Sequence, residues 1–396
     1  MHLDPTLVIV VGVSFAVIAV GLVLDYLKQP LVITYLLVGI VLGPGVFGLV
    51  QDAAYLGPLG SMGLVFLLFF VGMEIRPVEL IKSWRVAVIG TLLQVLGSCL
   101  AVWAIGWYFD WTLARIVLLG FVVSLSSTAI VVKMLQDSGE LSTDLGQDVL
   151  GILLVQDLVI VPMMIILGLL GGEQVGYADL VIQIVAAIVI VVLVIWVLRH
   201  PGFTIPGARF LKDNHELEVF GALAICLGFA FITGSVGLSS VLGAFVAGIC
   251  VSAAKETQWF HESLQPFHVL LVACFFLSVG LMLDLQFVLE RWHEIVFLVA
   301  AVFFTNILIN ASIMRVLGLT WKQSFYGGSM LSQIGEFSFV LAAIGFAGGI
   351  INEEGYQLVV ATIVFSLIFS PLLIGMMRRV TSTGLSDRPA GFTRRK

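Results

Sequence analysis

Long apolar runs alternate with short polar segments along nearly the whole chain. A helix needs about 20 mostly apolar residues to cross a bilayer, and cutting the sequence at charges, Gly/Pro clusters and polar stretches leaves thirteen such runs. They lie at about 7–24, 31–50, 56–73, 84–108, 113–135, 149–170, 180–198, 217–233, 237–253, 266–283, 295–317, 323–349 and 356–377. The pattern predicts an all-α polytopic membrane protein with 13 transmembrane helices.

Composition supports the same fold class. Of the 396 residues, 60% are hydrophobic and 11% are charged, whereas a soluble domain carries about 25% charged residues. So few charges cannot coat a water-facing surface, which excludes a soluble enzyme and a nucleic-acid binder. The four cysteines lie inside apolar runs without a CxxC pair, so we expect neither a disulfide framework nor a metal site built on them.

The distribution of basic residues orients the predicted spans. With an outside N-terminus, the inside segments hold 17 of the 19 Lys and Arg residues, which leaves Arg115 and Arg291 outside. Such segregation follows the positive-inside rule. We therefore expect an outside N-terminus and a cytoplasmic C-terminus, in a bacterial-type inner membrane.

Three sequence motifs recur in the same order at offsets of about 209 residues. Leu36–Leu42 (LLVGIVL) matches Phe245–Val251 (FVAGICV), and Phe70–Ile75 (FVGMEI) matches Ser278–Leu283 (SVGLML). The third pair joins LLVQDLVIVP, which starts at residue 153, to TIVFSLIFSP, which starts at residue 362. Since seven spans separate equivalent starts, equivalent helices run in opposite directions. This predicts two inverted six-helix repeats, an architecture common in secondary transporters.

The repeat predicts the domain organisation. Residues 1–179 form the first six-helix repeat, with core helices at 113–170. Residues 180–215 form a linker helix and cytoplasmic loop, and 216–380 form the second, inverted repeat, with core helices in part of 295–377. Residues 381–396 form a cytoplasmic tail.

Asp157 is the main candidate for chemistry. It lies within the strongly apolar run 149–170, where a charged Asp costs about 2.5–3.5 kcal/mol on insertion scales. Desolvation disfavours its charged form, so one carboxylate can hold a proton or a cation in competition. Its repeat equivalent is Ser366, so the acid is not a by-product of the scaffold. The alternative is a structural Asp hydrogen-bonded to a neighbouring helix.

Two polar interruptions occur at equivalent places in the repeats. The run 113–135 contains Ser126, Ser127 and Thr128, hydroxyl residues that permit local unwinding. Unwound carbonyls and half-helix ends can ligate a small cation. The alternative is that these hydroxyls bond back to their own helix.

The second interruption lies in the run 323–349 and contains Gln333, Gly335 and Glu336. Glu336 suits the N-terminus of a half-helix, where negative charge is favoured. For this residue we favour a structural role over transport.

Several further polar residues have open roles. Asn306 and Asn310 are four residues apart and share one helix face, either towards the crossing of the interrupted helices or as packing amides. Glu74 fits a rim ion pair, and Asp148 fits a solvated helix end better than an inner funnel.

These motifs resemble the Kef-type potassium/proton antiporters of the monovalent cation:proton antiporter-2 family. Gln156-Asp157 resembles the Gln-Asp motif of that family, and Leu125–Ile130 (LSSTAI) resembles its unwound helix. Gly335-Glu336-Phe337 resembles its GEF motif, and His261–Phe267 resembles its cytoplasmic loop. The resemblance covers nearly the whole membrane region.

The resemblance implies a homodimer with a scaffold domain and a mobile core, working by elevator-type alternating access around crossed discontinuous helices. It implies that Asp157 is the exchanging carboxylate, with Gln156 as an uncharged neighbour. A single acid implies electroneutral exchange.

Two departures from the family matter. Many relatives carry a lysine where we align Asn306. Kef proteins also continue into a cytoplasmic nucleotide-binding regulatory domain, whereas this sequence ends about 19 residues after the last predicted span. Either the protein lacks that domain or subunit, or the sequence stops before it.

We therefore expect an antiporter that exchanges K⁺, or alternatively Na⁺, for H⁺ in contact with membrane lipid and without a cofactor. The transported ion would bind Asp157 transiently. Three alternatives stay open: a gated cation channel without obligatory proton coupling, a solute symporter on a similar fold, and an ion-binding sensor.

Overall fold

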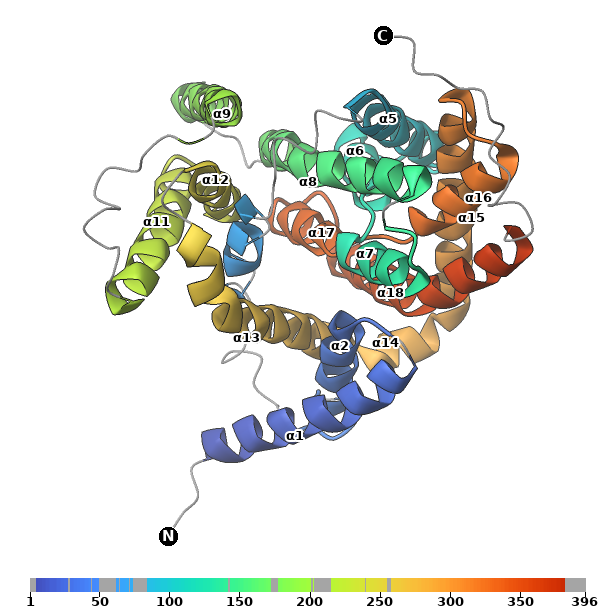
Figure 1. The fold of residues 1–396 in the computed structure, drawn as a ribbon, viewed down its shortest axis with the longest axis horizontal. Coiled ribbons are helices and arrows are strands. Elements are labelled where there is room, and N and C mark those ends of the chain that lie inside the picture. The colour runs from blue at the N-terminus through green and yellow to red at the C-terminus, as the bar shows by residue number, and fades with distance from the viewer. Residues whose placement is uncertain are drawn as a thin grey trace. The chain divides into compact units, whose positions relative to one another are not determined.

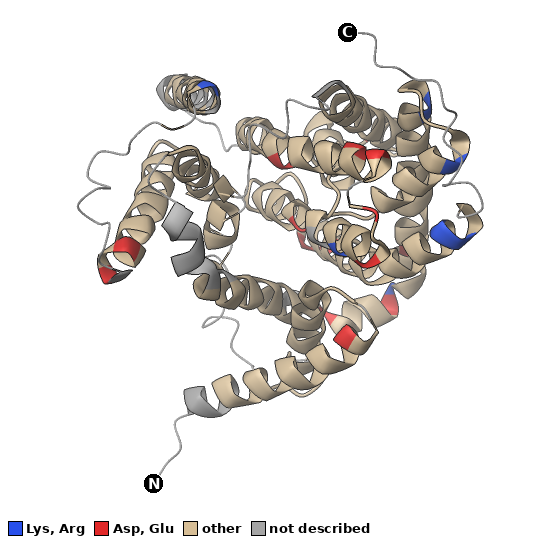
Figure 2. Ribbon diagram, viewed as in Figure 1, with Lys and Arg blue, Asp and Glu red and all other residues tan. Residues whose placement is uncertain are grey.

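The computed structural model describes residues 5–27, 29–43, 45–49, 62–63, 65–70, 72–73, 84–141, 143–171, 177–200, 202, 215–238, 240–254 and 258–381. Within these ranges every regular element is a helix (Figure 1). Figure 2 shows that charged residues occupy few positions along the described ribbon. The predicted all-α class is therefore confirmed for the described part of the chain. Glu74 lies outside it.

Most described helices lie on the predicted apolar runs. The helix of run 31–50 ends at Leu42, that of run 266–283 begins at Gln258, and the short helix Leu285–Glu290 lies outside the predicted runs. Part of run 56–73 lies outside the described residues. The described helices are α1 (Pro5–Tyr26), α2 (Leu31–Leu42), α5 (Trp84–Tyr108), α6 (Leu113–Ser124), α7 (Thr128–Ser138), α8 (Asp144–Leu170), α9 (Tyr177–Arg199), α11 (His215–Ser235), α12 (Ser240–Ala253), α13 (Gln258–Met282), α14 (Leu285–Glu290), α15 (Trp292–Val316), α16 (Trp321–Met330), α17 (Phe337–Ala347) and α18 (Glu353–Thr381).

Five of the described helices are long and apolar enough to cross a membrane. They are Val86–Tyr108, Asp144–Leu170, Glu216–Ser235, Trp292–Val316 and Glu353–Thr381. The predicted runs 113–135 and 323–349 each form two shorter helices. The full count of thirteen spans stays a prediction.

The chain divides into two compact units. Unit 1 comprises Met1–Lys82, Asp157–Trp292 and Val340–Ala361, and unit 2 comprises Ser83–Gln156, His293–Phe339 and Thr362–Lys396. The chain passes from unit 2 to unit 1 within α8, between Gln156 and Asp157.

Unit 1 is held together by glycines that let helix backbones touch. A Cβ on Gly39 of α2 would collide with the Leu277 carbonyl oxygen of α13. A Cβ on Gly280 of α13 would collide with the Leu36 carbonyl oxygen of α2. Small residues allow this close approach in membrane proteins, where van der Waals packing drives helix association.

A second glycine pair repeats this contact. A Cβ on Gly72 would collide with the Phe245 carbonyl oxygen of α12, and a Cβ on Gly248 would collide with that of Phe69. The sequence motifs make Gly39 equivalent to Gly248, and Gly72 equivalent to Gly280. The contact between Gly39 and Gly280 therefore corresponds, in the repeat, to the contact between Gly248 and Gly72.

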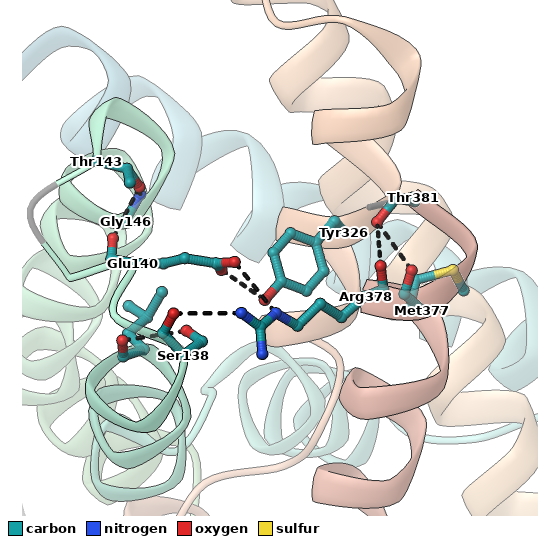
Figure 3. Close-up of polar contacts among 9 residues, drawn as sticks. Ser138, Glu140, Thr143, Gly146, Tyr326, Met377, Arg378 and Thr381 are labelled. Carbon is teal, nitrogen blue, oxygen red and sulfur yellow. Dashed lines mark hydrogen bonds and ion pairs between the residues drawn. The ribbon is translucent and has the colours of Figure 1, made fainter. Parts of the chain in front are cut away.

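In unit 2, one carboxylate links three helices. Gly139, at φ +70°, ends α7 in the left-handed conformation that glycine adopts most easily. Glu140 follows it and accepts hydrogen bonds from the Tyr326 hydroxyl of α16 at 2.7 Å and from Arg378 Nε of α18 at 3.2 Å (Figure 3). Arg378 also donates to the Ser138 carbonyl at 3.2 Å. This arrangement fixes the end of α7 against α16 and α18.

We expect Gly280→Ala to destabilise the protein by about 1–3 kcal/mol, because the new methyl group meets a rigid backbone. Gly228→Ala on α11 is the matched control, since nothing lies within 4 Å of its added Cβ. That substitution should be neutral or stabilising by up to about 1 kcal/mol. Thermal unfolding in detergent measures both variants. Equal melting temperatures would contradict the packing argument.

We expect Glu140→Ala to cost about 1.5–3 kcal/mol, because the Tyr326 hydroxyl and the Arg378 guanidinium lose a charged acceptor. The Glu140 side chain is only 17% exposed. Asp137→Ala is the control, because its ion pair with Lys133 has side chains 40% and 31% exposed. An exposed pair of this kind contributes about 0.5 kcal/mol at most. The same unfolding assay should separate the two variants, and a control loss as large as that of Glu140→Ala would refute the assignment.

Candidate functional site

The first interruption separates α6 from α7. The three residues between them are Leu125, Ser126 and Ser127, all buried, with exposed fractions of 2% or less. Leu125 (φ −88°, ψ 125°) and Ser127 (φ −78°, ψ 114°) have extended backbones. Ser127 caps α7 by accepting the Ile130 N–H at 3.4 Å, and Thr128 is the first residue of that helix. The hydroxyl run therefore coincides with an unwound segment.

The second interruption separates α16 from α17 and spans residues 331–336. Ser332 and Gln333 are fully buried, and Glu336 is 8% exposed. Glu336 lies directly before Phe337, the first residue of α17, and its carbonyl oxygen accepts the Phe339 N–H at 3.2 Å. Glu336 thus lies directly before a helix N-terminus.

The two interruptions bind each other directly. Ser126 Oγ donates to the Leu331 carbonyl at 2.9 Å, and the Gly335 N–H donates to the Leu125 carbonyl at 2.7 Å. A Cβ on Gly335 would lie 2.6 Å from Ser126 backbone atoms, so this approach requires glycine. We call this contact between residues 125–127 and 331–336 the crossing. All of it belongs to unit 2.

Each carbonyl oxygen from residue 121 to residue 125 accepts a hydrogen bond. A helix end leaves carbonyls without intrahelical donors, and in a membrane each unsatisfied group costs several kcal/mol. The donors are Ser124 Oγ to Phe121 O at 2.8 Å, Ser338 Oγ to Val122 O at 2.7 Å, Asn306 Nδ2 to Val123 O at 2.9 Å, Gln94 Nε2 to Ser124 O at 3.0 Å and the Gly335 N–H to Leu125 O at 2.7 Å.

Gln156 braces the first interruption from α8. Its Oε1 accepts the Ser126 N–H at 3.0 Å, and its Nε2 donates to Gln94 Oε1 at 2.7 Å and to the Ser124 carbonyl at 3.3 Å. The side chain is 1% exposed. Gln156 therefore uses both ends of its amide to hold the unwound backbone.

Asp157 follows Gln156 and is 5% exposed. Leu153 and Ile160, its neighbours within one helical turn on α8, are fully buried. The carboxylate thus lies in the middle of a 27-residue apolar helix, away from either end. Asp148, nearer the start of α8, is only half-buried.

Asn306, on α15, connects the last turn of α6 to the second interruption. Its Nδ2 donates to the Val123 carbonyl at 2.9 Å and to the Ser332 carbonyl at 3.1 Å. Asn310 Nδ2 donates to the Leu331 carbonyl at 3.3 Å. The sequence left open whether these two amides face the crossing or pack against a neighbouring helix. Both donate to carbonyl oxygens of the crossing. Gln333 Nε2 donates to the Ser127 carbonyl at 3.4 Å.

Sequence reasoning missed three supporting residues: Gln94, Ser338 and Ser366. Ser366, the repeat equivalent of Asp157, accepts the Ile334 N–H at 3.2 Å through its hydroxyl oxygen. Gln94 offered a signal, since it is an amide within the apolar run 84–108. The two serines offered none, because isolated serines are common in membrane helices and bond to their own backbone.

The described residues hold no group of three or more His, Cys, Asp or Glu side chains that could bind a metal ion. The oxygen atoms at the crossing come from amides, hydroxyls, backbone carbonyls and the Glu336 carboxylate. Such hard oxygens suit a monovalent or alkaline-earth cation.

Comparison with known proteins shows which protein family the chain matches. The family of transmembrane sodium/hydrogen exchangers matches residues 12–377. The chain is 35% identical to the iron transporter MagA of Paramagnetospirillum magneticum, over 95% of this chain and 86% of that protein. It is 30% identical to K(+) efflux antiporter 5 of Arabidopsis thaliana, over 95% of this chain and 67% of that protein.

The chain is also 32% identical to a glutathione-regulated potassium-efflux system protein of Haemophilus influenzae, over 88% of this chain and 57% of that protein. Among solved structures, the fold resembles the sodium proton antiporter MjNhaP1 of Methanocaldococcus jannaschii, with a TM-score of 0.66 and 16% identity. That match covers 97% of this chain and all of the other.

These matches confirm the resemblance to Kef-type cation/proton antiporters, which are integral membrane transporters that need no cofactor. The chain belongs to the transmembrane sodium/hydrogen exchanger family.

Proposed function

We propose that the protein exchanges a monovalent cation, K⁺ before Na⁺, for a proton, and that Asp157 binds both in turn. The observation that carries this proposal is a carboxylate 5% exposed in the middle of an apolar helix. Burial away from water makes the charged form of a carboxylate costly. A proton or a bound cation each neutralises that charge, so the two ions compete for one group.

The residues around the first interruption support a one-for-one exchange. Gln156, Gln94 and Ser126 are neutral, and their hydrogen bonds to one another do not depend on a titrating group. A single carboxylate that trades one proton for one monovalent cation moves no net charge. The exchange is therefore electroneutral.

K⁺ is our preferred substrate because the relatives from Arabidopsis thaliana and Haemophilus influenzae are named for potassium efflux. The name of MagA favours iron as the second candidate. Iron is bound well by sets of imidazole and carboxylate ligands, whereas the crossing is lined mainly by amides, hydroxyls and backbone carbonyls. This chemistry does not favour iron, and the names of the potassium-efflux relatives favour K⁺.

Elevator-type alternating access is part of the proposal, with a mobile core that carries the interrupted helices. Its support is that both interruptions and the side chains that brace them belong to one compact unit. The core would draw on helices within 113–170 and 295–377, and the scaffold on the remaining helices of the repeats 1–179 and 216–380.

An inverted repeat also belongs to the proposal, with the linker at 180–215. The glycine contacts support it. Replacing each glycine of the Gly39–Gly280 contact by its equivalent in the other repeat gives the Gly248–Gly72 contact, which is also present. A two-fold axis that relates the repeats produces such a pair of contacts. We likewise propose thirteen spans, an outside N-terminus, a cytoplasmic tail at 381–396 and a homodimer in the inner membrane.

Asp157→Asn should abolish exchange, because a neutral amide cannot trade a proton for a cation. The assay uses proteoliposomes that enclose a pH-sensitive dye, with K⁺, Na⁺ or Fe²⁺ added outside. We expect a K⁺-dependent pH change in the wild type, unaltered in rate by an imposed membrane potential, and only the leak of protein-free liposomes in the variant. Asp148→Asn, on the same helix, is the matched control and should keep exchange.

Three results would contradict the proposal. Cation flux without proton movement would indicate a channel, Fe²⁺-driven proton movement would indicate an iron transporter, and full exchange by Asp157→Asn would exclude that carboxylate.

A further inference from the structure

Two amide oxygens at the crossing accept no hydrogen bond from any described residue. They are Asn306 Oδ1 and Gln333 Oε1, both on side chains with 0% exposure. Buried acceptors in folded proteins are nearly always paired, and each exception needs a physical reason. Here two exceptions belong to side chains that bind the same pair of interruptions.

The orientation of Asn306 follows from its partners. Its Nδ2 donates to two carbonyl oxygens, of Val123 and Ser332. Exchanging the amide oxygen and nitrogen would place three acceptors together, so Oδ1 must be the atom that faces away from both carbonyls. Gln333 follows the same logic, since its Nε2 donates to the Ser127 carbonyl.

Other acceptors at the crossing are already engaged. The carbonyl oxygens of residues 121–125, 331 and 332 each accept a hydrogen bond. Gln94 Oε1 and Gln156 Oε1 do so as well. Asn306 and Gln333 carry the amide oxygens that no such contact engages.

We propose that Asn306 Oδ1 and Gln333 Oε1 are ligands of the transported monovalent cation and that they set its preference for K⁺ over Na⁺. The inference rests on the proposed function. Amide oxygens are neutral and can replace part of the hydration shell of an ion, as carbonyl oxygens do in potassium filters. A small number of such weak-field ligands favours the larger, more easily dehydrated ion.

A neutral ligand also separates cation binding from proton binding. Amide oxygens do not titrate in the working pH range, so they strengthen binding of the cation and leave binding of the proton unchanged. Replacing them should raise the KM for the cation, whereas proton binding measured in the absence of the cation should not change. Replacing an amide with a merely structural role would not change the KM for the cation separately from proton binding.

The test compares three glutamine variants of the full chain in proteoliposomes. Gln333→Met removes the oxygen but keeps the length of the side chain, and should raise the KM for K⁺ about tenfold, the loss of one interaction with a charged group. Vmax should change little, and the ratio of K⁺ to Na⁺ KM values should move towards Na⁺. Gln333→Glu restores an oxygen at the same length, so K⁺ binding should return and should depend more steeply on pH.

Gln94→Met is the matched control. Gln94 is equally buried and belongs to the same network, but its oxygen already accepts a hydrogen bond from Gln156. Its loss should lower the melting temperature and the maximal rate without changing the ratio of K⁺ to Na⁺ KM values. In detergent, K⁺ should raise the melting temperature of the wild type and of Gln94→Met more than that of Gln333→Met.

The outcomes separate the inference from the proposed function. If the wild type exchanges K⁺ for H⁺ and Asp157→Asn does not, while Gln333→Met keeps the wild-type KM and selectivity, the function stands and the ligand assignment is wrong. If Gln333→Met and Gln333→Glu lose K⁺ affinity equally, the role of Gln333 is structural and the assignment is also wrong. If the wild type moves no protons in response to any cation, the proposed function itself fails.

Discussion

The structure depends on how two helices can stop and restart inside a membrane. Each interruption frees backbone carbonyls and amides that water cannot reach, and each unsatisfied group costs several kcal/mol there. The protein satisfies them largely with side chains from other helices. Gln94 from α5 and Asn306 from α15 donate to carbonyls at the end of α6, and Gln156 from α8 accepts the N–H of the unwound Ser126. The interruptions can therefore exist only together with those three helices.

The same requirement explains why so many buried polar residues of unit 2 are neutral. Amides and hydroxyls can donate and accept without the desolvation cost of a charge. A charge added to such a network stands out energetically. Gln156, which accepts the Ser126 N–H, directly precedes Asp157 in the sequence.

Glycine has a related role in both units. In unit 1, Gly39 and Gly280 bring α2 and α13 into backbone contact, and in unit 2, Gly335 allows one interruption to touch the other. Lipid offers no hydrophobic force to press helices together, so close packing has to supply the attraction. Side chains at these positions would separate the backbones that are in contact there.

The sequence by itself determined the helical class, most helix bounds, the two interruptions and the isolated acid at Asp157. These features depend on local hydropathy and on the cost of polar atoms in lipid, which a single chain segment already displays. Only the tertiary structure decided that Gln156 is a brace, that Asn306 joins the end of α6 to the second interruption, and that Gln94, Ser338 and Ser366 take part. A hydrogen bond between residues as far apart as 126 and 331 depends on how helices pack, and no local pattern encodes the direction in which a buried amide points.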